Sequence, residues 1–219
     1  MNAQTLAPWL ERLSEAAHAE LEARNDARDA LLRQSRSLIR LCARAISAAH
    51  RDDWGNARDL LAQADEAAAA MMRHETRFPD LFYAGYTQDA LKEWIEAQLT
   101  LAFLADEALP DPLTSGVPFA TYLNGLAEAA SELRRRVLDR MRRGGEAAMA
   151  EAERLLALMD AIYETLLAFS YPDAISGGLR RRVDQLRGVL ERTRGDLTNS
   201  LQVARLLKAL EAAEEATTR

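Results

Sequence analysis

Apolar side chains recur every three or four residues along most of the chain, with polar residues at the positions between them. The stretch 147–169 is the clearest example, with apolar residues at Leu155, Leu156, Met159, Ile162, Tyr163, Leu166 and Leu167. This spacing is typical of an α-helix that buries one face. Clusters of β-branched residues, which would indicate strands, are absent from the sequence. The pattern therefore predicts an all-α fold, a bundle of seven helices.

Turn-forming residues divide the chain into seven helical stretches. The predicted helices cover 6–51, 54–73, 87–108, 118–144, 147–169, 179–195 and a last stretch from 199 or 200 onward. Asn25-Asp26 marks a point where the first stretch can break, and Asn199 or Ser200 is suited to cap the last one. The last stretch carries an apolar seam suited to another helix or another subunit, made of Leu201, Leu206, Leu207 and Leu210. We expect one helical domain over 1–219.

Composition narrows the class of protein. The chain has 219 residues, 48% hydrophobic and 28% charged, as in ordinary globular proteins, and it is long enough for a substantial core. No apolar run is long enough for a membrane span and no secretory signal is visible, so we expect a cytoplasmic protein. A net charge of −6 gives no bulk attraction for nucleic acid. The single cysteine, Cys42, excludes an internal disulfide and is expected to be a packed thiol.

Acidic side chains gather on one face of each of two predicted helices. They are Asp89, Glu93 and Glu96 in 87–108, and Glu128 and Glu132 in 118–144. Steps of three and four place each set on one stripe, and Lys92 is the only basic residue close enough to offset the first set. Two such stripes can converge on a hard divalent cation, because Mg²⁺ and Mn²⁺ prefer oxygen ligands. The same spacing suits an ordinary exposed polar face, so both interpretations stay open.

Basic residues form a row on the first predicted helix. The row consists of Arg33, Arg36, Arg40, Arg44 and Arg51, with His50 beside it. A solvated face with salt bridges to neighbouring helices would explain this row, and so would a set of guanidinium groups aimed at phosphates. His50 is expected to pack or to contact phosphate rather than to bind a metal.

Three segments of the chain carry motifs in a distinctive order. The first is the basic helix from Ser35 to His50-Arg51, the second is Ala90-Leu91-Lys92-Glu93-Trp94-Ile95-Glu96-Ala97, and the third is Tyr122-Leu123-Asn124-Gly125-Leu126-Ala127-Glu128, continuing to Glu132-Leu133. Together they resemble the translin family, and specifically its catalytic branch, translin-associated factor X and its prokaryotic relatives. The corresponding family segments read Gln-Glu-Tyr-Val-Glu-Ala and Tyr-Leu-x-Gly-x-Ala-Asp.

The resemblance implies an all-α, seven-helix subunit that assembles into a hollow, usually octameric shell and binds single-stranded RNA or DNA inside it. Its catalytic branch implies a Mg²⁺- or Mn²⁺-dependent endoribonuclease. Carried over by position, the metal-binding and catalytic acids fall on Glu93, Glu96, Glu128 and Glu132. The basic row then gains a role in sequence-independent phosphate contact, from Arg33, Arg36, Arg40, Arg44, His50 and Arg51.

Two departures from the family keep an alternative function open. Glu128 stands where the family has Asp, which moves the carboxylate by about one C–C bond, and catalysis responds to displacements on the order of 1 Å. Ser131 replaces the family's Gly. The alternative is a non-catalytic binder of single-stranded RNA or DNA, like translin itself. A di-iron bundle is disfavoured, because Glu93 is followed at the third position by Glu96 rather than by the histidine of that class.

Overall fold

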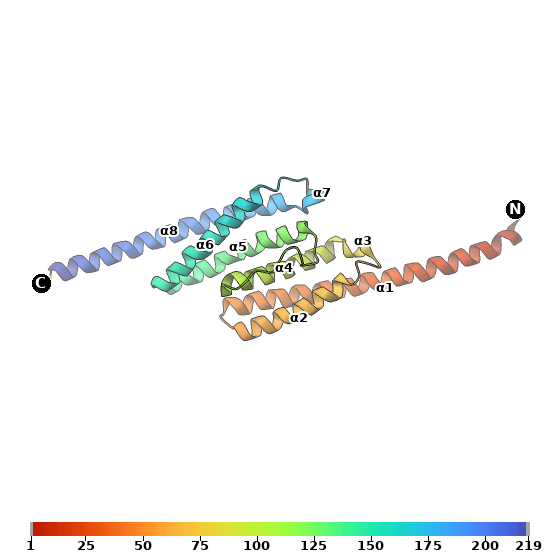
Figure 1. The fold of residues 1–219 in the computed structure, drawn as a ribbon, viewed down its shortest axis with the longest axis horizontal. Helices are drawn as coiled ribbons and strands as arrows, with labels where there is room; N and C mark the ends of the chain where they lie inside the picture. The colour runs from red at the N-terminus through yellow and green to blue at the C-terminus, as the bar shows by residue number, and fades with distance from the viewer. Residues whose placement is uncertain (1, 218–219) are drawn as a thin grey trace.

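The computed structural model describes residues 2–217, which contain eight α-helices and no strand (Figure 1). The helices are α1 (Ala3–His50), α2 (Trp54–Met72), α3 (Pro79–Phe82), α4 (Gly85–Ala105), α5 (Phe119–Arg143), α6 (Glu146–Leu167), α7 (Asp173–Ser176) and α8 (Leu179–Thr217). Two of them, α3 and α7, are single turns. The predicted all-α class is confirmed. Within the described range, no helix is both long and apolar enough to span a membrane.

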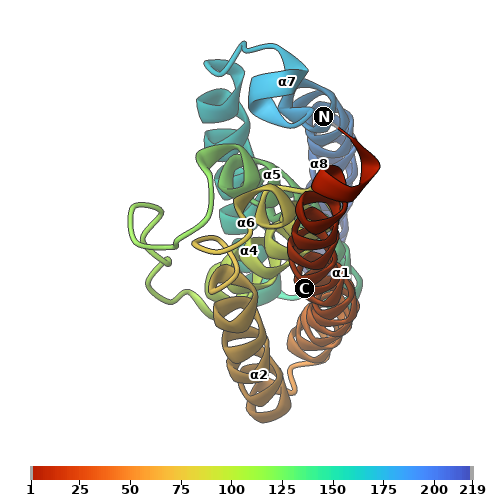
Figure 2. The ribbon, with the colours of Figure 1, turned by 90° about the vertical axis from the view of Figure 1, so that its right-hand side faces the viewer.

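The long helices pack side by side in a bundle. Helix α1 packs on α2 and α4, α4 packs on α5, and α5 packs on α6 and α8. Figure 2, viewed along the long axis, shows α1 and α8 on one side of the bundle with α4 and α5 beside them. Figure 1 shows that the N-terminal part of α1 and the C-terminal part of α8 project beyond the bundle at opposite ends. The helices α4 and α5 therefore form the centre of the molecule.

The core lies where the apolar stripes of these helices meet. The larger cluster joins α1, α2, α4, α5, α6 and α8, and it includes fully buried residues such as Leu38, Leu91 and Leu133. A smaller cluster, around Leu166 and Leu186, joins α5, α6 and α8. Thirteen residues of α4 are buried, which makes this helix the most enclosed of the long ones and leaves little freedom to its polar side chains.

Two predicted helix boundaries are wrong. Helix α1 continues through Asn25-Asp26 without a break, and α8 continues through Gly195, so no new helix is capped at Asn199 or Ser200. In α8 the reason is packing: Thr193 and Leu197, on either side of Gly195, are both buried and hold the turn in helical form. A glycine inside a helix costs only about 1 kcal/mol, which such packing offsets.

Gly125 permits the close approach of α5 to α4. A Cβ atom at this position would lie 2.9 Å from Ile95 Cβ and 2.9 Å from the Lys92 carbonyl oxygen. We expect Gly125→Ala to lower the free energy of unfolding by about 1–3 kcal/mol, because the two helices must move apart. Urea denaturation measures the change. Gly195→Ala is the control, since no atom lies within 4 Å of its added Cβ; it should raise stability by about 0.5–1 kcal/mol. Equal effects of both substitutions would contradict this interpretation.

Candidate metal centre

Three glutamates from the two central helices converge on one point. Glu93 and Glu96 come from α4 and Glu128 comes from α5, and one carboxylate oxygen of each lies within 4.8 Å of the others. All three side chains are partly buried. Each step of three or four residues along a helix keeps these groups on the face where α4 and α5 meet. A set of hard oxygen donors at this separation fits a divalent cation such as Mg²⁺ or Mn²⁺.

Glu132, one helical turn beyond Glu128, is not part of this group and has a different partner. Its Oε1 lies 2.8 Å from Nε2 of His50, which comes from the end of α1. Because a carboxylate only accepts, the imidazole proton is assigned to Nε2. The His50 ring is buried, with the residue 3% exposed, and its Nδ1 has no hydrogen-bond partner among the described residues. The structure thus places His50 beside an acid of the predicted site and inside the protein.

Two cations flank the three carboxylates. The Lys92 ammonium donates to Glu93 Oε1 at 2.8 Å and also to Glu128 Oε2. Arg182, from α8, donates from Nε to Glu128 Oε1 at 2.7 Å and from Nη1 to Asn124 Oδ1 at 3.0 Å. Burial alone would lower the pKa of Lys92, but its hydrogen bonds to Glu128 and Glu93 outweigh that effect and raise it. Lys92 is therefore a charged group inside the site.

Glu96 differs from its neighbours because no hydrogen bond or ion pair joins it to another side chain in residues 2–217. Burial, followed by repulsion from the carboxylates of Glu93 and Glu128, raises its pKa to about 8, against the opposing influence of Lys92. A carboxylate held in this way gains from an external cation, which would replace its proton.

The metal-free protein should lose stability as the pH rises from about 5 to 8. In the unfolded chain Glu96 releases its proton near its ordinary pKa of 4.5, whereas in the folded protein it keeps the proton to about 8. The unfolded state therefore binds fewer protons in this window, and the free energy of unfolding falls, by on the order of 3 kcal/mol. Urea denaturation in EDTA at pH 5.5 and 8.5 measures the difference.

The control for this pH dependence is a pair of single variants. Glu96→Gln should remove most of the loss between pH 5.5 and 8.5, because the amide does not titrate. Glu153→Gln changes an exposed glutamate on α6 and should keep the loss. An unchanged pH profile in Glu96→Gln would show that another group is responsible.

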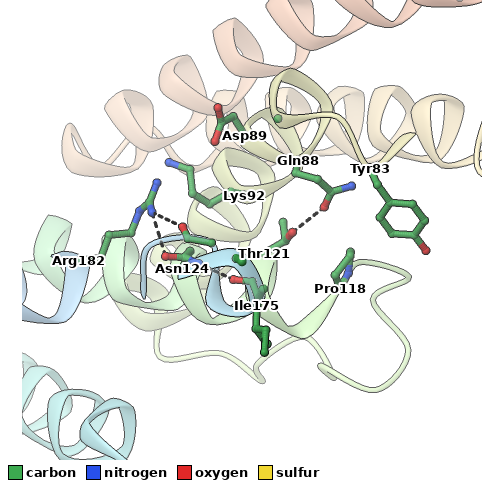
Figure 3. Close-up of a pocket in the computed structure, with 13 residues that line it drawn as sticks. Tyr83, Gln88, Asp89, Lys92, Pro118, Thr121, Asn124, Ile175 and Arg182 are labelled. Atoms are coloured by element: carbon green, nitrogen blue, oxygen red, sulfur yellow. Dashed lines mark hydrogen bonds between the residues drawn. The ribbon is translucent and has the colours of Figure 1, made fainter. Parts of the chain in front are cut away.

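A cavity of about 430 Å³ is lined by Lys92 and Arg182, the two cations that contact the carboxylates (Figure 3). Its polar wall is formed by Gln88, Asp89, Lys92, Thr121, Asn124 and Arg182. Most of these groups are held in place: Gln88 accepts a hydrogen bond from Thr121 at 2.6 Å, and the Asn124 amide donates to the Ser176 carbonyl at 2.8 Å. Figure 3 shows the Lys92 amine and the Arg182 guanidinium ending on the same side of this cavity. The cavity thus connects solvent with the cationic side of the site.

The arginine row lies on the exposed face of α1. Arg33, Arg36, Arg40, Arg44 and Arg51 are all exposed. In the described part of the chain, the first four form no ion pair, whereas Arg51 donates to the hydroxyl of Ser47 at 2.7 Å. Salt bridges to neighbouring helices therefore do not explain the row. Cys42, on the opposite face, is buried, and burial raises the pKa of its thiol to about 12, as suits a packed cysteine.

Sequence reasoning missed two polar residues of the site. Arg182 reaches Glu128 only because α8 packs against α5, and Asn124 supports Arg182 by accepting its hydrogen bond; no local spacing predicts these contacts. The pairing of His50 with Glu132 depends in the same way on where α1 ends. The proximity of Lys92 to Glu93 was predicted, whereas its second contact, with Glu128, was not.

Comparison with known proteins gives relatives over most of the chain. It is 31% identical to an uncharacterized protein from Methanocaldococcus jannaschii over 189 residues, which cover 85% of this chain and 82% of that protein. The AfC3PO–duplex RNA complex and the crystal structure of AfC3PO each match with a TM-score of 0.80 and 32% identity, over 89% of this chain and 98% and 99% of theirs. The crystal structure of apo-NeC3PO matches with a TM-score of 0.75 at 18% identity, over 87% of this chain and 96% of that one, and shows the shared fold. No protein-family profile matches the chain.

Proposed function

The chain belongs to the translin family, to which the C3PO structures belong, and we propose that it is an RNA-binding protein that cleaves single-stranded RNA with Mg²⁺ or Mn²⁺. The observation that carries this proposal is the convergence of Glu93, Glu96 and Glu128 within 4.8 Å, beside a cavity lined by two cations. Paired helices that bring acids together in this way provide a metal site, which a plain binder would not require.

In the proposed reaction, Glu93, Glu96 and Glu128 hold the cation. The cation supplies Lewis-acid activation of the scissile phosphate and of water. Lys92 and Arg182, at the wall of the cavity, attract the phosphate and keep Glu128 oriented. Glu132, which lies 2.8 Å from His50, would accept a proton from the attacking water or serve as a further ligand. The cavity, at about 430 Å³, has room for a nucleotide next to the scissile bond.

The arginine row supplies the electrostatic part of RNA binding. Arg33, Arg36, Arg40 and Arg44 are exposed and form no ion pair within residues 2–217, so their guanidinium groups are available to phosphates. Such contacts are independent of sequence and weaken with salt. We expect the subunits to assemble into a hollow oligomer that encloses this surface and admits flexible RNA strands. Light scattering or mass photometry measures this assembly. Single-stranded DNA presents the same phosphates and is a further expected ligand.

The test is incubation of purified protein with a labelled single-stranded RNA and with its duplex form, in Mg²⁺, Mn²⁺ or EDTA. AfC3PO has been described in complex with duplex RNA, so both forms must be compared. We expect cutting of the single strand that depends on the metal and exceeds cutting of the duplex. Equal cutting of both forms would contradict the choice of substrate.

One observation favours the alternative of a non-catalytic binder. Lys92 and Arg182 already neutralise part of the acidic group, in the way that a bound metal would. Binding of RNA without cutting under any of these conditions would establish that alternative, since binding requires the arginines and not the acids.

A further inference from the structure

We infer that the centre takes one divalent cation per subunit, because Lys92 and Arg182 already supply the positive charge that a second ion would bring. The inference rests on the proposed metal-dependent function and specifies its metal content. Nucleases with acidic centres use one metal or two, and the two arrangements differ in how the developing charge is stabilised. Here the protein supplies the second positive group itself.

The first argument for a single ion comes from the contacts of Glu128. Its Oε1 receives the Arg182 Nε at 2.7 Å and its Oε2 receives the Lys92 ammonium, so both oxygens already face a protein cation. One oxygen of Glu93, Oε1, is engaged by the same ammonium at 2.8 Å. The oxygens without a protein cation are those of Glu96 and the second oxygen of Glu93. One oxygen of each of Glu93, Glu96 and Glu128 lies within 4.8 Å of the others, a set that suffices to anchor a single ion.

The Lys92 side chain is built into the protein. Only 9% of it is exposed, and it lies between α4 and α5 rather than extending into solvent. A buried ammonium is costly unless it is paired, and this one has two carboxylate partners. It therefore remains in place when a metal enters, and it keeps a second ion away by repulsion.

Charge balance also favours one divalent ion per subunit. The three converging carboxylates, Glu93, Glu96 and Glu128, carry three negative charges when ionised, and Lys92 and Arg182 carry two positive ones. One divalent ion turns the remaining charge of minus one into plus one. A second divalent ion would leave an excess of three positive charges in a partly buried site, which is unfavourable.

The choice of lysine at this position is unusual for the chain. Only two of its 28 basic residues are lysines, Lys92 and Lys208, and the remainder are arginines. A compact ammonium with three donors fits between two carboxylates, whereas the planar guanidinium fork requires more room. Figure 3 shows the Lys92 amine beside the Arg182 guanidinium at one side of the cavity. Together they form a compact pair of positive groups.

The test is titration of the metal-free, full-length protein with Mn²⁺, followed by isothermal calorimetry and by the electron paramagnetic resonance signal of free Mn²⁺. We expect one Mn²⁺ per subunit in the unaltered protein. In Lys92→Gln we expect a second, weaker site, and an affinity at the first site at least about tenfold higher, because a nearby positive charge is lost. Arg182→Gln should change the affinity in the same direction. Lys208→Gln, at an exposed position on α8, is the matched control and should keep one site with unchanged affinity.

Each outcome bears on a different statement. Two ions per subunit in the unaltered protein would overturn the inference and leave the proposed nuclease standing. An unchanged count and affinity in both Lys92→Gln and Arg182→Gln would overturn the role of the two cations. If the unaltered protein binds no Mn²⁺, the proposed metal-dependent function fails, and the inference fails with it. The count in the unaltered protein decides the matter even if a variant does not fold.

Discussion

A Glu93→Gln, Glu96→Gln double variant is expected to lose RNA cleavage by on the order of 10³-fold while it keeps its affinity for RNA. The two side chains provide two of the three converging carboxylates, and Glu96 provides the one that no protein cation neutralises. Glutamine keeps the size of each side chain and removes its charge. The fold should survive, because burial and the repulsion of neighbouring carboxylates raise the pKa of Glu96, and glutamine removes the charge that both disfavour.

Single-turnover cleavage of a labelled single-stranded RNA in saturating Mn²⁺ measures the loss of the cleavage rate. Fluorescence anisotropy in EDTA measures the affinity for RNA. The matched control is a Glu153→Gln, Glu164→Gln double variant, which removes two exposed glutamates of α6 and should cleave at the normal rate. Retention of full activity in the first double variant would place the chemistry elsewhere. A parallel loss of binding would show that these acids support the RNA surface rather than the reaction.

The arginine row should dominate the affinity for RNA. Replacing Arg33, Arg36, Arg40 and Arg44 with glutamine should weaken binding of single-stranded RNA by about 10²–10³-fold at 0.1 M salt, since each phosphate contact on a single strand contributes a salt slope of about 0.7. The slope of the affinity against salt should fall by up to about three for the same reason. The cleavage rate at saturating RNA should stay unchanged, because no residue of the row contacts the carboxylates.

The control for the row removes an equal charge from another helix. Arg180, Arg181, Arg192 and Arg205 are exposed on α8 and form no ion pair within the described residues. Their replacement with glutamine should change the affinity by less than about threefold. Equal losses in both variants would show that RNA responds to the overall charge of the subunit and not to a defined surface.

Helical spacing predicts only part of the acidic group. The choice of Glu93, Glu96, Glu128 and Glu132 as one set comes from the family resemblance, and Glu132 lies outside the three that converge. Glu93 and Glu96 share a face of α4 by their separation alone, and Glu128 faces them because Gly125, one turn earlier, lets α5 approach α4 closely. The partners from α1 and α8 could not be predicted in this way. His50 and Arg182 reach the centre only through the packing of whole helices, whose angles depend on many side chains at once.

The boundaries of the long helices could also be predicted only in part. Turn-forming residues correctly separate α1 from α2 and α5 from α6, where Asp52-Asp53 and Gly144-Gly145 interrupt the apolar stripes. They mislead at Asn25 and Gly195, because a residue with low helix propensity remains helical when its neighbours are held by tertiary contacts. The helix propensity of a residue therefore sets the end of a helix only where the burial of its neighbours does not hold the chain in helical form.

Amide hydrogen exchange in the projecting ends of α1 and α8 can report whether the subunit contacts a neighbouring chain. Side chains such as Trp9, Leu13, Leu206 and Leu210 are about half exposed or more, so these turns gain little from tertiary packing in one subunit. A helix without such packing opens readily, and its amide hydrogens exchange with solvent within the dead time of most measurements. The amides of α4, the most enclosed of the long helices, should exchange only through global unfolding. Slow exchange in the projecting turns would therefore reveal contact with a neighbouring chain, and the protected residues would map the interface at single-turn resolution.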